Sequence, residues 1–528
     1  MKTRTRREFV KGMLTGAAAC ALGSRLGARS SARAAEKPNI LLIMADDMGW
    51  SDVGCYGGEV RTPNIDWLAA NGVRFTQAYN TAKCFPSRAC ALTGVYAQQC
   101  GMDVRHGALK RAVTLGEVLR TAGYRTLWSG KHHGTENPYT RGFDRYFGLR
   151  DGCCNFWNPG NQRPGEGPPA RKRVRTWCID EETYKPYTPP DPKFYTTDAF
   201  TDRALSWLDQ YEDDGKPFFL YMAYNAPHYP LHAWPEDIAK YRGVYDRGYD
   251  AIRQTRYRRQ LRTGLLDARS APLPDSAYRS WSGLSRDERA KEIRRMEIYA
   301  AMTDRLDQNV GRILQKLRAQ GKLENTLVMF CSDNGACAEM PKVKQSGEMG
   351  TVTSYPVLGR SWAEVSNTPL RKYKNYSHEG GICTPLVAYW PKEIRDKGAI
   401  RRDPVHFIDF MATFADVAGA RYPTRGPNGQ QVTPLQGVSI RPAFGGKPPK
   451  REKPIFWQWS RGRAIRKGDL KLVEWNGQWE LCNIANNRTE TRNLIDAHPE
   501  TVKALREEWS AWYRSCTGKG YGRDRKGG

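Results

Sequence analysis

Pro38-Asn39-Ile40-Leu41-Leu42-Ile43-Met44-Ala45-Asp46-Asp47 is the stretch that decides the fold. Its unbroken apolar run from Ile40 to Ala45 is typical of a strand buried on both faces, as in a parallel sheet covered by helices. Two carboxylates follow at the carboxyl end of the strand, the edge where ligands gather in open α/β sheets. Because adjacent acids repel each other unless a cation lies between them, Asp46 and Asp47 predict a metal site. A solvated turn is the alternative.

A second stretch of the same kind lies far along the chain. Thr326-Leu327-Val328-Met329-Phe330-Cys331-Ser332 is again a buried apolar run, and Asp333-Asn334-Gly335 follows it. Asp-Asn-Gly alone also fits an ordinary turn. Together, the two strand ends offer three carboxylates and an amide oxygen, which is the ligand chemistry of Ca²⁺ or Mg²⁺ and not of zinc.

Basic side chains occupy further strand ends. The predicted strand Tyr124–Ser129 is followed by Gly130-Lys131-His132-His133, and the predicted strand Pro217–Tyr224 by Asn225-Ala226-Pro227-His228. Lys374 comes shortly before His378-Glu379-Gly380-Gly381. A single histidine at such a place is more often structural, whereas recurrence after several strands favours one shared site.

Cys84-Phe85-Pro86-Ser87-Arg88 adds a nucleophile to this set. Pro86 suits the first turn of a helix, where its missing N–H costs nothing. We therefore expect Cys84 just before a helix, at the positive end of its dipole, with Arg88 within one turn. A nucleophile beside an anion site favours chemistry on a negatively charged ester.

Together these motifs resemble those of the formylglycine-dependent sulfatases of the alkaline phosphatase superfamily, in particular bacterial arylsulfatase-like members. The resemblance runs from about Pro38 to about Leu494. It rests on Asp46-Asp47-Met48-Gly49, the Cys-x-Pro-x-Arg signature at 84–88, Gly-Lys-x-His at 130–133, Ala-Pro-His at 226–228, Ser-Asp-Asn-Gly at 332–335 and Glu-Gly-Gly at 379–381. The implied fold is α/β: a large, mostly parallel sheet flanked by helices, with a smaller C-terminal antiparallel sheet plus helix.

The resemblance also implies a metal and a modified residue. One Ca²⁺ per chain would be bound by Asp46, Asp47, Asp333 and Asn334, with the side chain of Cys84 near or on the metal. A formylglycine-generating enzyme would oxidise Cys84 to formylglycine. One hydroxyl of its hydrate would attack sulfur, and the second would allow sulfate to leave.

The remaining roles are implied in the same way. Arg88, Lys131 and Lys374 would hold the sulfate oxygens, and His228, together with Lys374, would protonate or stabilise the leaving alkoxide. His133 would take a proton from the second hydroxyl. The family usually has tryptophan where this chain has His132, so the sequence leaves open which imidazole faces the site.

The two ends of the chain have their own signals. Thr5-Arg6-Arg7-Glu8-Phe9-Val10-Lys11 matches a twin-arginine export signal, and Ala32-Arg33-Ala34 a cleavage site. We therefore expect a signal peptide at 1–35, read by the twin-arginine translocase, and a periplasmic or secreted protein. A catalytic domain is expected at 36–450, a small C-terminal α+β domain at 451–516 with a helix from about Pro499 to Tyr513, and a disordered tail at 517–528. No segment has the roughly 18 apolar residues of a membrane span.

The formal net charge is +27, of which about +20 remains after removal of the signal. Such a field attracts polyanions. Nucleic acid is not expected because the chain has no zinc knuckle and no RRM-type motif, whereas export favours a sulfated polysaccharide. Diffuse charge that only keeps the protein soluble is the alternative.

Two regions are interpreted as specificity elements, and the pairing of the cysteines is left open. Residues 150–195 predict a long loop over the mouth of the pocket. The basic stretch Tyr241–Arg295, which includes Arg256-Tyr257-Arg258-Arg259, is interpreted as mostly helical, with a solvated face in preference to a polyanion cradle. The irregularly spaced cysteines fit disulfides in an oxidising compartment, with no readable pairing.

Three functions fit the sequence. The first is a sulfuric ester hydrolase that cleaves O-sulfate esters, with sulfated carbohydrates as candidate substrates. The second is a phosphodiesterase or phosphonate monoester hydrolase of the same superfamily. The third is a non-catalytic protein that binds sulfated glycans. A binding protein would tolerate loss of Arg88, Lys131 or His228, and since all three are present, the sequence favours the first function.

Overall fold

The computed structural model describes residues 37–171, 174–343 and 346–521. The predicted signal peptide, residues 1–35, lies outside these ranges. The chain from Pro38 onward forms one unit, to which everything below refers.

A mixed sheet of 11 strands forms the centre of this unit, in the order β10-β2-β9-β8-β1-β7-β3-β4-β5-β6, with β11 beside β2. Strand β1 (Asn39–Ala45) lies between β8 (Thr326–Ser332) and β7 (Phe218–Ala223) and is parallel to both. Strand β3 (Arg125–Gly130) is parallel to β7. The other strands are β2 (Val73–Tyr79), β4 (Arg145–Leu149), β5 (Trp177–Ile179), β6 (Glu182–Tyr184), β9 (Cys383–Tyr389), β10 (Ala399–Arg401) and β11 (Val405–His406).

The expected parallel sheet is therefore confirmed at the centre of the structure. Antiparallel strands occur on either side of it: β9 runs against β8 and β2, and β5 runs against β4 and β6. The runs predicted as strands at Ile40–Ala45 and Thr326–Ser332 coincide with β1 and β8, apart from the extra residue Asn39 at the start of β1.

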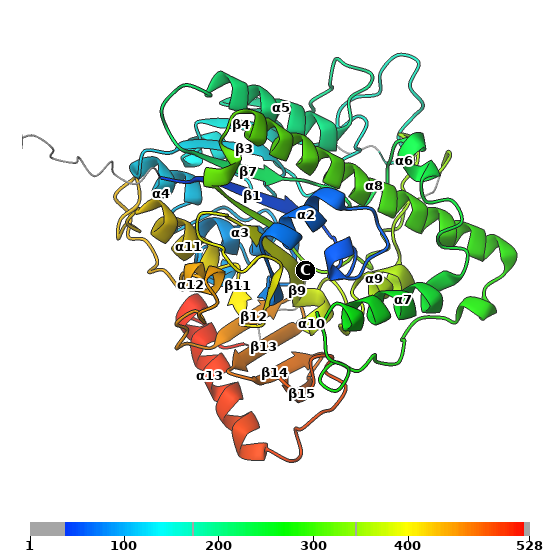
Figure 1. The fold of residues 1–528 in the computed structure, drawn as a ribbon, viewed down its shortest axis with the longest axis vertical. Helices are drawn as coiled ribbons and strands as arrows, with labels where there is room; N and C mark the ends of the chain where they lie inside the picture. Colours follow the sequence, from blue (N-terminus) through cyan, green and yellow to red (C-terminus); the bar gives the residue numbers. More distant parts are fainter. Residues whose placement is uncertain (1–36, 172–173, 344–345, 522–528) are drawn as a thin grey trace, which may run out of the picture. The chain divides into compact units, whose positions relative to one another are not determined.

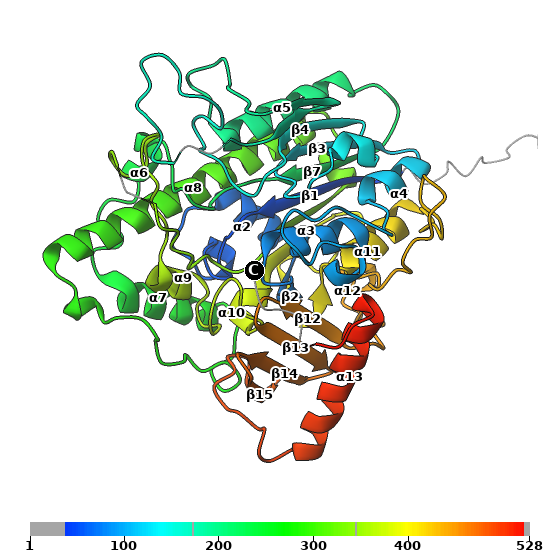
Figure 2. The ribbon, with the colours of Figure 1, turned by 180° about the vertical axis from the view of Figure 1, so that it is seen from behind.

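Helices cover both faces of the sheet, which explains why β1 is apolar throughout. Leu41, Ile43 and Ala45 pack in the hydrophobic core that contains α2 (Pro63–Asn71), α5 (Thr196–Gln210) and α8 (Arg286–Ala319), while the alternate residues pack with α3 (Cys84–Thr93), α4 (Leu115–Thr121) and α11 (Asp409–Ala418). Figure 1 shows the first set and Figure 2 the second. The shorter or peripheral helices are α6 (Pro235–Ala239), α7 (Gly248–Arg262), α9 (Arg360–Ser366), α10 (Glu379–Ile382) and α12 (Arg441–Phe444).

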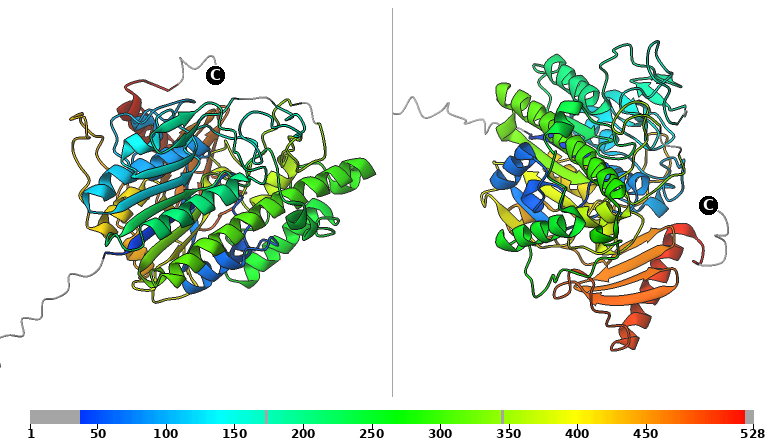
Figure 3. Two further views of the ribbon diagram at one scale, coloured as in Figure 1. Left: turned by 90° about the horizontal axis from the view of Figure 1, so that it is seen from above. Right: turned by 90° about the vertical axis from the view of Figure 1, so that its right-hand side faces the viewer.

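A second, antiparallel sheet is formed by the C-terminal part of the chain. Its strands β12 (Ile455–Trp459), β13 (Gly462–Lys467), β14 (Leu470–Trp475) and β15 (Gln478–Asn483) follow one another in space as in sequence, and α13 (Pro499–Thr517) packs on them (Figure 3). Two details differ from expectation. Helix α13 continues beyond Tyr513, and Tyr521, in the expected disordered tail, packs edge-on against Trp509 with ring centroids 5.2 Å apart.

Arg256 corrects the interpretation of the basic stretch. It lies on α7, but its side chain is 0% exposed and pairs with Asp52 and Glu59, each at 2.7 Å. It is a structural cation and not part of a solvated helix face. Unpaired cysteines are a second finding, since all twelve cysteines of the described ranges are free thiols. Within those same ranges, no helix is long and apolar enough to cross a membrane.

Candidate active site

Four adjacent parallel strands, β8, β1, β7 and β3, carry the predicted acidic residues, Lys131, His133 and His228 after their carboxyl ends, whereas Cys84 and Arg88 lie on α3 and Lys374 on a loop. Ala45 is in register with Ser332, so the acidic pair after β1 lies beside Asp333 and Asn334 after β8. Lys131 follows β3, and His228 follows β7 by a few residues. Residues separated by almost 290 positions are thus brought together because their strands are neighbours.

The acidic side chains form a buried cluster with Cys84. Ligand atoms of Asp46, Cys84 and Asp333 lie within 4.8 Å of one another, as do those of Asp46, Asp47 and His228. Burial raises the pKa of Asp46 well above its ordinary value; Lys131 opposes this shift, and the charges of Asp333 and Asp47 add to it. The cluster is therefore electrostatically costly without a further positive charge.

Two buried oxygens of this cluster fit a hard cation. Asp46 Oδ1 and Asn334 Oδ1 accept no hydrogen bond from any described residue, although buried polar atoms are almost always partnered. The amide of Asn334 donates through Nδ2 to Asp47 Oδ1 at 2.6 Å and to the carbonyl oxygen of Gly335 at 2.9 Å, which leaves its oxygen free to bind a cation. Carboxylate and amide oxygens in this arrangement suit Ca²⁺ or Mg²⁺.

Cys84 is the first residue of α3, one position further into the helix than expected, and Lys83 is the N-cap. Its side chain is fully buried. Burial raises the pKa of the Cys84 thiol, while the nearby charges of Lys131 and Lys374 oppose the shift. The group is therefore a neutral thiol at ordinary pH and not an activated thiolate.

Three buried cations surround the cysteine. Arg88 Nε donates to Asp333 Oδ2 at 2.8 Å, and Lys131 Nζ to Asp46 Oδ2 at 2.5 Å. Lys374 Nζ donates to both oxygens of Asp47, at 2.6 and 2.8 Å.

The protonation of these groups follows from their pairing. Burial alone would lower the pKa of Lys374, but Asp47 outweighs it and raises the pKa well above its usual value. The same balance raises the pKa of Lys131 through Asp46, and that of Arg88 through Asp333. Burial opposes ionisation of Asp47, yet His228 and Lys374 hold its pKa below the ordinary range. All three cations are therefore fully charged, and they offer an anion several strong donors.

The two histidines that follow β3, His132 and His133, lie in different environments. His132 is 3% exposed, packs against Trp128 with ring centroids 5.1 Å apart, and its Nε2 lies 3.8 Å from Glu136. Burial lowers the pKa of His133 well below its ordinary value, and the charges of Lys131 and Arg88 lower it further. His133 is thus the imidazole beside the cationic cluster.

His228 lies on the other side of the acidic pair. Its Nε2 is 3.4 Å from Asp47 Oδ2, and its Nδ1 is 2.5 Å from the carbonyl oxygen of Tyr229. Because a carbonyl only accepts, Nδ1 carries the proton in the neutral ring. Burial lowers the pKa of His228 to about 3; Asp47 opposes the shift and Lys374 adds to it.

Glu339 is a further member of the site that sequence reasoning missed. It accepts from Tyr229 Oη at 2.8 Å and from Asn375 Nδ2 at 3.0 Å, and it pairs with Lys83. Burial raises the pKa of Glu339, but Lys374 and Lys83 outweigh it and hold the pKa below the ordinary range. Glu339 lies seven residues beyond the end of β8, in an irregular segment, so the strand-end pattern gave no signal for it.

The loop that carries Lys374 is held by the C-terminal sheet. Arg371 at its start pairs with Glu480 on β15 at 2.8 Å, and His378 Nε2 at its end lies 3.1 Å from the same carboxylate. Tyr376 stacks on Trp475 with ring centroids 4.0 Å apart. Lys372 and Asn375 adopt positive φ angles of 68° and 79°, which non-glycine residues rarely do. A strained segment is thus fixed by contacts from outside the large sheet.

Comparison with known proteins agrees with this geometry. A family model described as sulfatase matches residues 38–420. An uncharacterized sulfatase of Schizosaccharomyces pombe is 32% identical over 530 residues, covering 92% of this chain and 94% of that protein. An arylsulfatase of Klebsiella aerogenes is 30% identical over 458 residues, covering 80% and 96%. Among solved structures, Ps i-CgsB matches with a TM-score of 0.67 and 28% identity, covering 90% of this chain and 93% of that one. The chain belongs to the sulfatase family, in the alkaline phosphatase superfamily, and is a sulfatase enzyme.

Proposed function

We propose that this enzyme hydrolyses O-sulfate esters of sulfated carbohydrates, using a formylglycine made from Cys84 and one bound Ca²⁺. The observation that carries the proposal is the position of Cys84. It begins a buried helix, its sulfur lies within 4.8 Å of ligand oxygens of Asp46 and Asp333, and oxygens of Asp46 and Asn334 are left without partners. A neutral, fully buried thiol is poorly suited to attack an ester, whereas a precursor of another group needs no thiolate.

Asp46, Asp47, Asp333 and Asn334 would hold the cation. It would supply a fixed positive charge that polarises a sulfate oxygen and offsets the charge of the acidic cluster. Arg88 donates through Nε to Asp333, and its other two nitrogens donate to the carbonyl oxygens of Lys131 and Tyr224 at 3.3 Å. The two carbonyl contacts fix the guanidinium, which in turn would keep Asp333 oriented.

The sulfate group would be bound by the cations around Cys84. Lys131 and Lys374 each carry donors beyond those used on Asp46 and Asp47, since an ammonium has three. These donors stabilise charge that develops on the sulfate oxygens in the transition state.

A formylglycine hydrate at position 84 would supply one hydroxyl for attack on sulfur and a second through which sulfate leaves. His133 would accept the proton of that second hydroxyl, because its lowered pKa keeps the ring neutral. Lys374 would stabilise and protonate the leaving oxygen, because its ammonium stays charged. His228 Nε2 carries no proton in the neutral ring, since the proton lies on Nδ1, so it would donate only after it has taken up a proton.

A carbohydrate substrate is supported by a relative. Ps i-CgsB has been solved in complex with k-i-k-neocarrahexaose, at 27% identity to this chain and a TM-score of 0.66. We also infer export through the twin-arginine translocase, which rests on residues 1–35 of the sequence. Sequencing the N-terminus of protein purified from the periplasm or medium tests this, since a start near Glu36 is expected.

Mass spectrometry of the peptide that spans Cys84, from fully active protein, tests the central proposal. The aldehyde is lighter than the thiol, whereas its hydrate has the same nominal mass as the thiol, so the unhydrated peptide is the readout. An unmodified thiol in fully active enzyme contradicts the mechanism. Rates on an aryl sulfate and on an aryl phosphate diester then separate sulfatase from phosphodiesterase activity, and a clear preference for the diester would favour the latter.

A further inference from the structure

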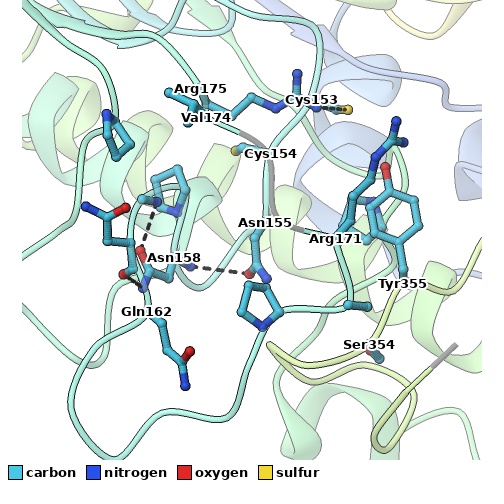
Figure 4. Close-up of a pocket in the computed structure, with 17 residues that line it drawn as sticks. Cys153, Cys154, Asn155, Asn158, Gln162, Arg171, Val174, Arg175, Ser354 and Tyr355 are labelled. Atoms are coloured by element: carbon cyan, nitrogen blue, oxygen red, sulfur yellow. Dashed lines mark hydrogen bonds between the residues drawn. The ribbon is translucent and has the colours of Figure 1, made fainter. Parts of the chain in front are cut away.

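A cavity of about 380 Å³ lies beside the catalytic residues, walled mainly by the loop between β4 and α5 (Figure 4). Its volume is at the lower end of the roughly 300–1,000 Å³ typical of small-molecule sites. The polar lining consists of side-chain amides and guanidinium groups: Asn155, Asn158, Asn161, Gln162, Arg171 and Arg175. Amides and an aromatic ring such as Tyr355 suit hydroxyl-rich ligands, while the arginines suit anions.

The cavity borders both catalytic imidazoles. Tyr229 packs on His228 with ring centroids 4.2 Å apart and on Tyr355, in the cavity wall, at 6.0 Å. On the other side, Gly152 precedes the wall residue Cys153, and a Cβ on Gly152 would lie only 2.5 Å from His133 Nε2. The cavity is thus separated by a single residue from each imidazole, close enough for a substrate bound at the sulfate site to extend into it.

Arg175 is the feature of the cavity that the reaction does not explain. Its side chain is 7% exposed, and no described carboxylate lies within ion-pairing distance of it. Its Nη2 donates to the sulfur of Cys153 at 3.0 Å, a contact drawn in Figure 4, but a cysteine sulfur is only a weak acceptor. A buried guanidinium without a counter-charge is costly.

Of two further arginines in this loop, one is neutralised by a carboxylate and one is not. Arg163, on the same loop, pairs with Glu166 at 3.3 Å. Arg171, at the exposed edge of the cavity, lies over the ring of Tyr355 at 5.9 Å and also has no described carboxylate partner. The cavity wall thus holds two arginines, Arg171 and Arg175, that have no carboxylate partner among the described residues.

We infer that this cavity binds the part of the substrate that carries the scissile ester, and that Arg175 recognises a second anionic group on it, a sulfate ester or a carboxylate. This inference rests on the proposed sulfate-ester hydrolysis and narrows its substrates to glycosides with two negative charges. The ligand's anion provides the counter-charge that the chain itself does not supply.

Substrate pairs test the assignment. Wild-type enzyme is compared on N-acetylgalactosamine 6-sulfate, its 4,6-disulfate, a glucuronate-containing disaccharide with the same 6-sulfate, and 4-nitrophenyl sulfate. We expect the doubly charged glycosides to have at least about tenfold higher kcat/KM than the monosulfate, because a hydrogen bond to a charged group contributes roughly this much. Comparison of the disulfated sugar with the glucuronate-containing disaccharide shows whether the second anionic group is a sulfate ester or a carboxylate.

Variants assign the preference to Arg175. Arg175→Gln is expected to abolish the preference while turnover of 4-nitrophenyl sulfate stays within about twofold, and Arg175→Lys to restore part of it. Arg163→Gln and Cys153→Ser are matched controls that should keep the preference. An equal loss on all substrates in Arg175→Gln, an undiminished preference in that variant, or its loss in Cys153→Ser overturns the inference.

A binding measurement keeps this test separate from the proposed function. In a Cys84→Ala background, which cannot turn over, calorimetry with the mono- and disulfated sugars should show at least about tenfold tighter binding of the disulfate, lost with Arg175→Gln. Equal affinities refute the Arg175 site even if the enzyme hydrolyses sulfate esters. A difference supports it even if turnover proves to be of another ester.

Discussion

His132 and His133 are adjacent in sequence, yet only one of them lies with the cationic groups of the site. The backbone at His133 has a positive φ of 66°, which turns the chain between the two side chains. His132 stands where the family usually has a tryptophan. Its ring packs on Trp128, so an imidazole takes the place of the larger aromatic side chain there. His133 packs edge-on against Phe85, the residue after Cys84, with ring centroids 5.3 Å apart.

The same substitution at both positions distinguishes these roles. His133→Gln is expected to lower kcat by about 10²- to 10⁴-fold, because it removes a proton acceptor. His132→Gln should change kcat by less than about threefold, with only the thermal midpoint reduced. Steady-state kinetics on an aryl sulfate, with calorimetric scans of both proteins, checks this. A larger loss of kcat in His132→Gln would exchange the two roles.

Which of these residues the sequence reveals depends on how each is positioned. Asp46, Asp333, Lys131 and His228 each follow a recognisable apolar strand, so their convergence was predictable from parallel pairing. Glu339 sits in an irregular segment and reaches Lys83 and Tyr229 only through tertiary contacts. No local pattern carries that information.

At the scale of elements, the C-terminal sheet supports the loop that carries Lys374. Glu480 on β15 contacts both ends of the segment Arg371–His378, which carries Lys374 near its middle. Removing this contact weakens the support of the positive φ angles at Lys372 and Asn375, which then depends on the Tyr376–Trp475 stacking and on the hydrogen bonds of Asn375. Lys374 would then be placed less accurately, and small displacements of a positioning group cost rate steeply.

We therefore expect Glu480→Gln to lower kcat/KM for an aryl sulfate by about tenfold, although no atom of Glu480 is part of the sulfate site. Glu508→Gln is the matched control, because Glu508 pairs with Lys467 of the same sheet at 3.0 Å on the exposed side. That variant should retain full activity. Similar losses in both variants, or none in Glu480→Gln, would show that the sheet has no positioning role.

A buried histidine, His232, links the loop that lines the cavity to the segment that contains Ser354. His232 is 0% exposed, its Nδ1 accepts from the Phe156 N–H at 3.4 Å, and its Nε2 lies 2.9 Å from the Ser354 carbonyl oxygen. Burial lowers the pKa of His232 to about 4, and the Ser354 contact opposes the shift. The unfolded chain has a pKa of about 6.5 at this residue.

Below pH 6.5 the unfolded state therefore takes up a proton that the folded state does not, so stability is lost as the pH falls from about 6.5 to 4. The loss amounts to about 3 kcal/mol. His232→Gln keeps a donor and an acceptor but does not titrate, so wild type should lose about 3 kcal/mol relative to this variant between pH 7 and pH 4. Denaturant unfolding at both pH values measures it. A difference independent of pH contradicts the neutral buried state.

The strands of the central sheet that carry the acidic residues could be predicted because their apolar runs are continuous. β13 has no such run, because Arg463, Arg466 and Lys467 stand in a stretch of only six residues. In the folded protein Arg466 is 4% exposed and donates to Tyr79 Oη and Gln77 Oε1, both at 2.6 Å. These partners lie on β2, almost 390 positions away, so the stretch could not be recognised as a buried strand from its own composition.

For the whole molecule, the acidic cluster joins two halves of the chain that no disulfide connects within the described ranges. Asp46 and Asp47 directly follow β1, the first strand of the large sheet. Asp333 and Asn334 directly follow β8, which comes after α8 in the sequence. With the proposed cation bound, the repulsion among the carboxylates is offset. Without it, Asp46 carries the cost of burial beside two like charges.

Calcium should therefore stabilise the folded protein as well as activate it. A ligand that binds only the folded state raises the free energy of unfolding by about 2.7 kcal/mol at one hundred times its Kd. We expect EGTA to lower the thermal midpoint and the activity together, and excess Ca²⁺ to restore both. Asn334→Ala removes one ligand oxygen and should shift the calcium dependence of the midpoint to higher concentrations, whereas Asn161→Ala, in the cavity wall, should not. A midpoint insensitive to EGTA and to added Ca²⁺ in metal-free protein would contradict the cation site, because the unpartnered oxygens of Asp46 and Asn334 would then have no ligand to bind.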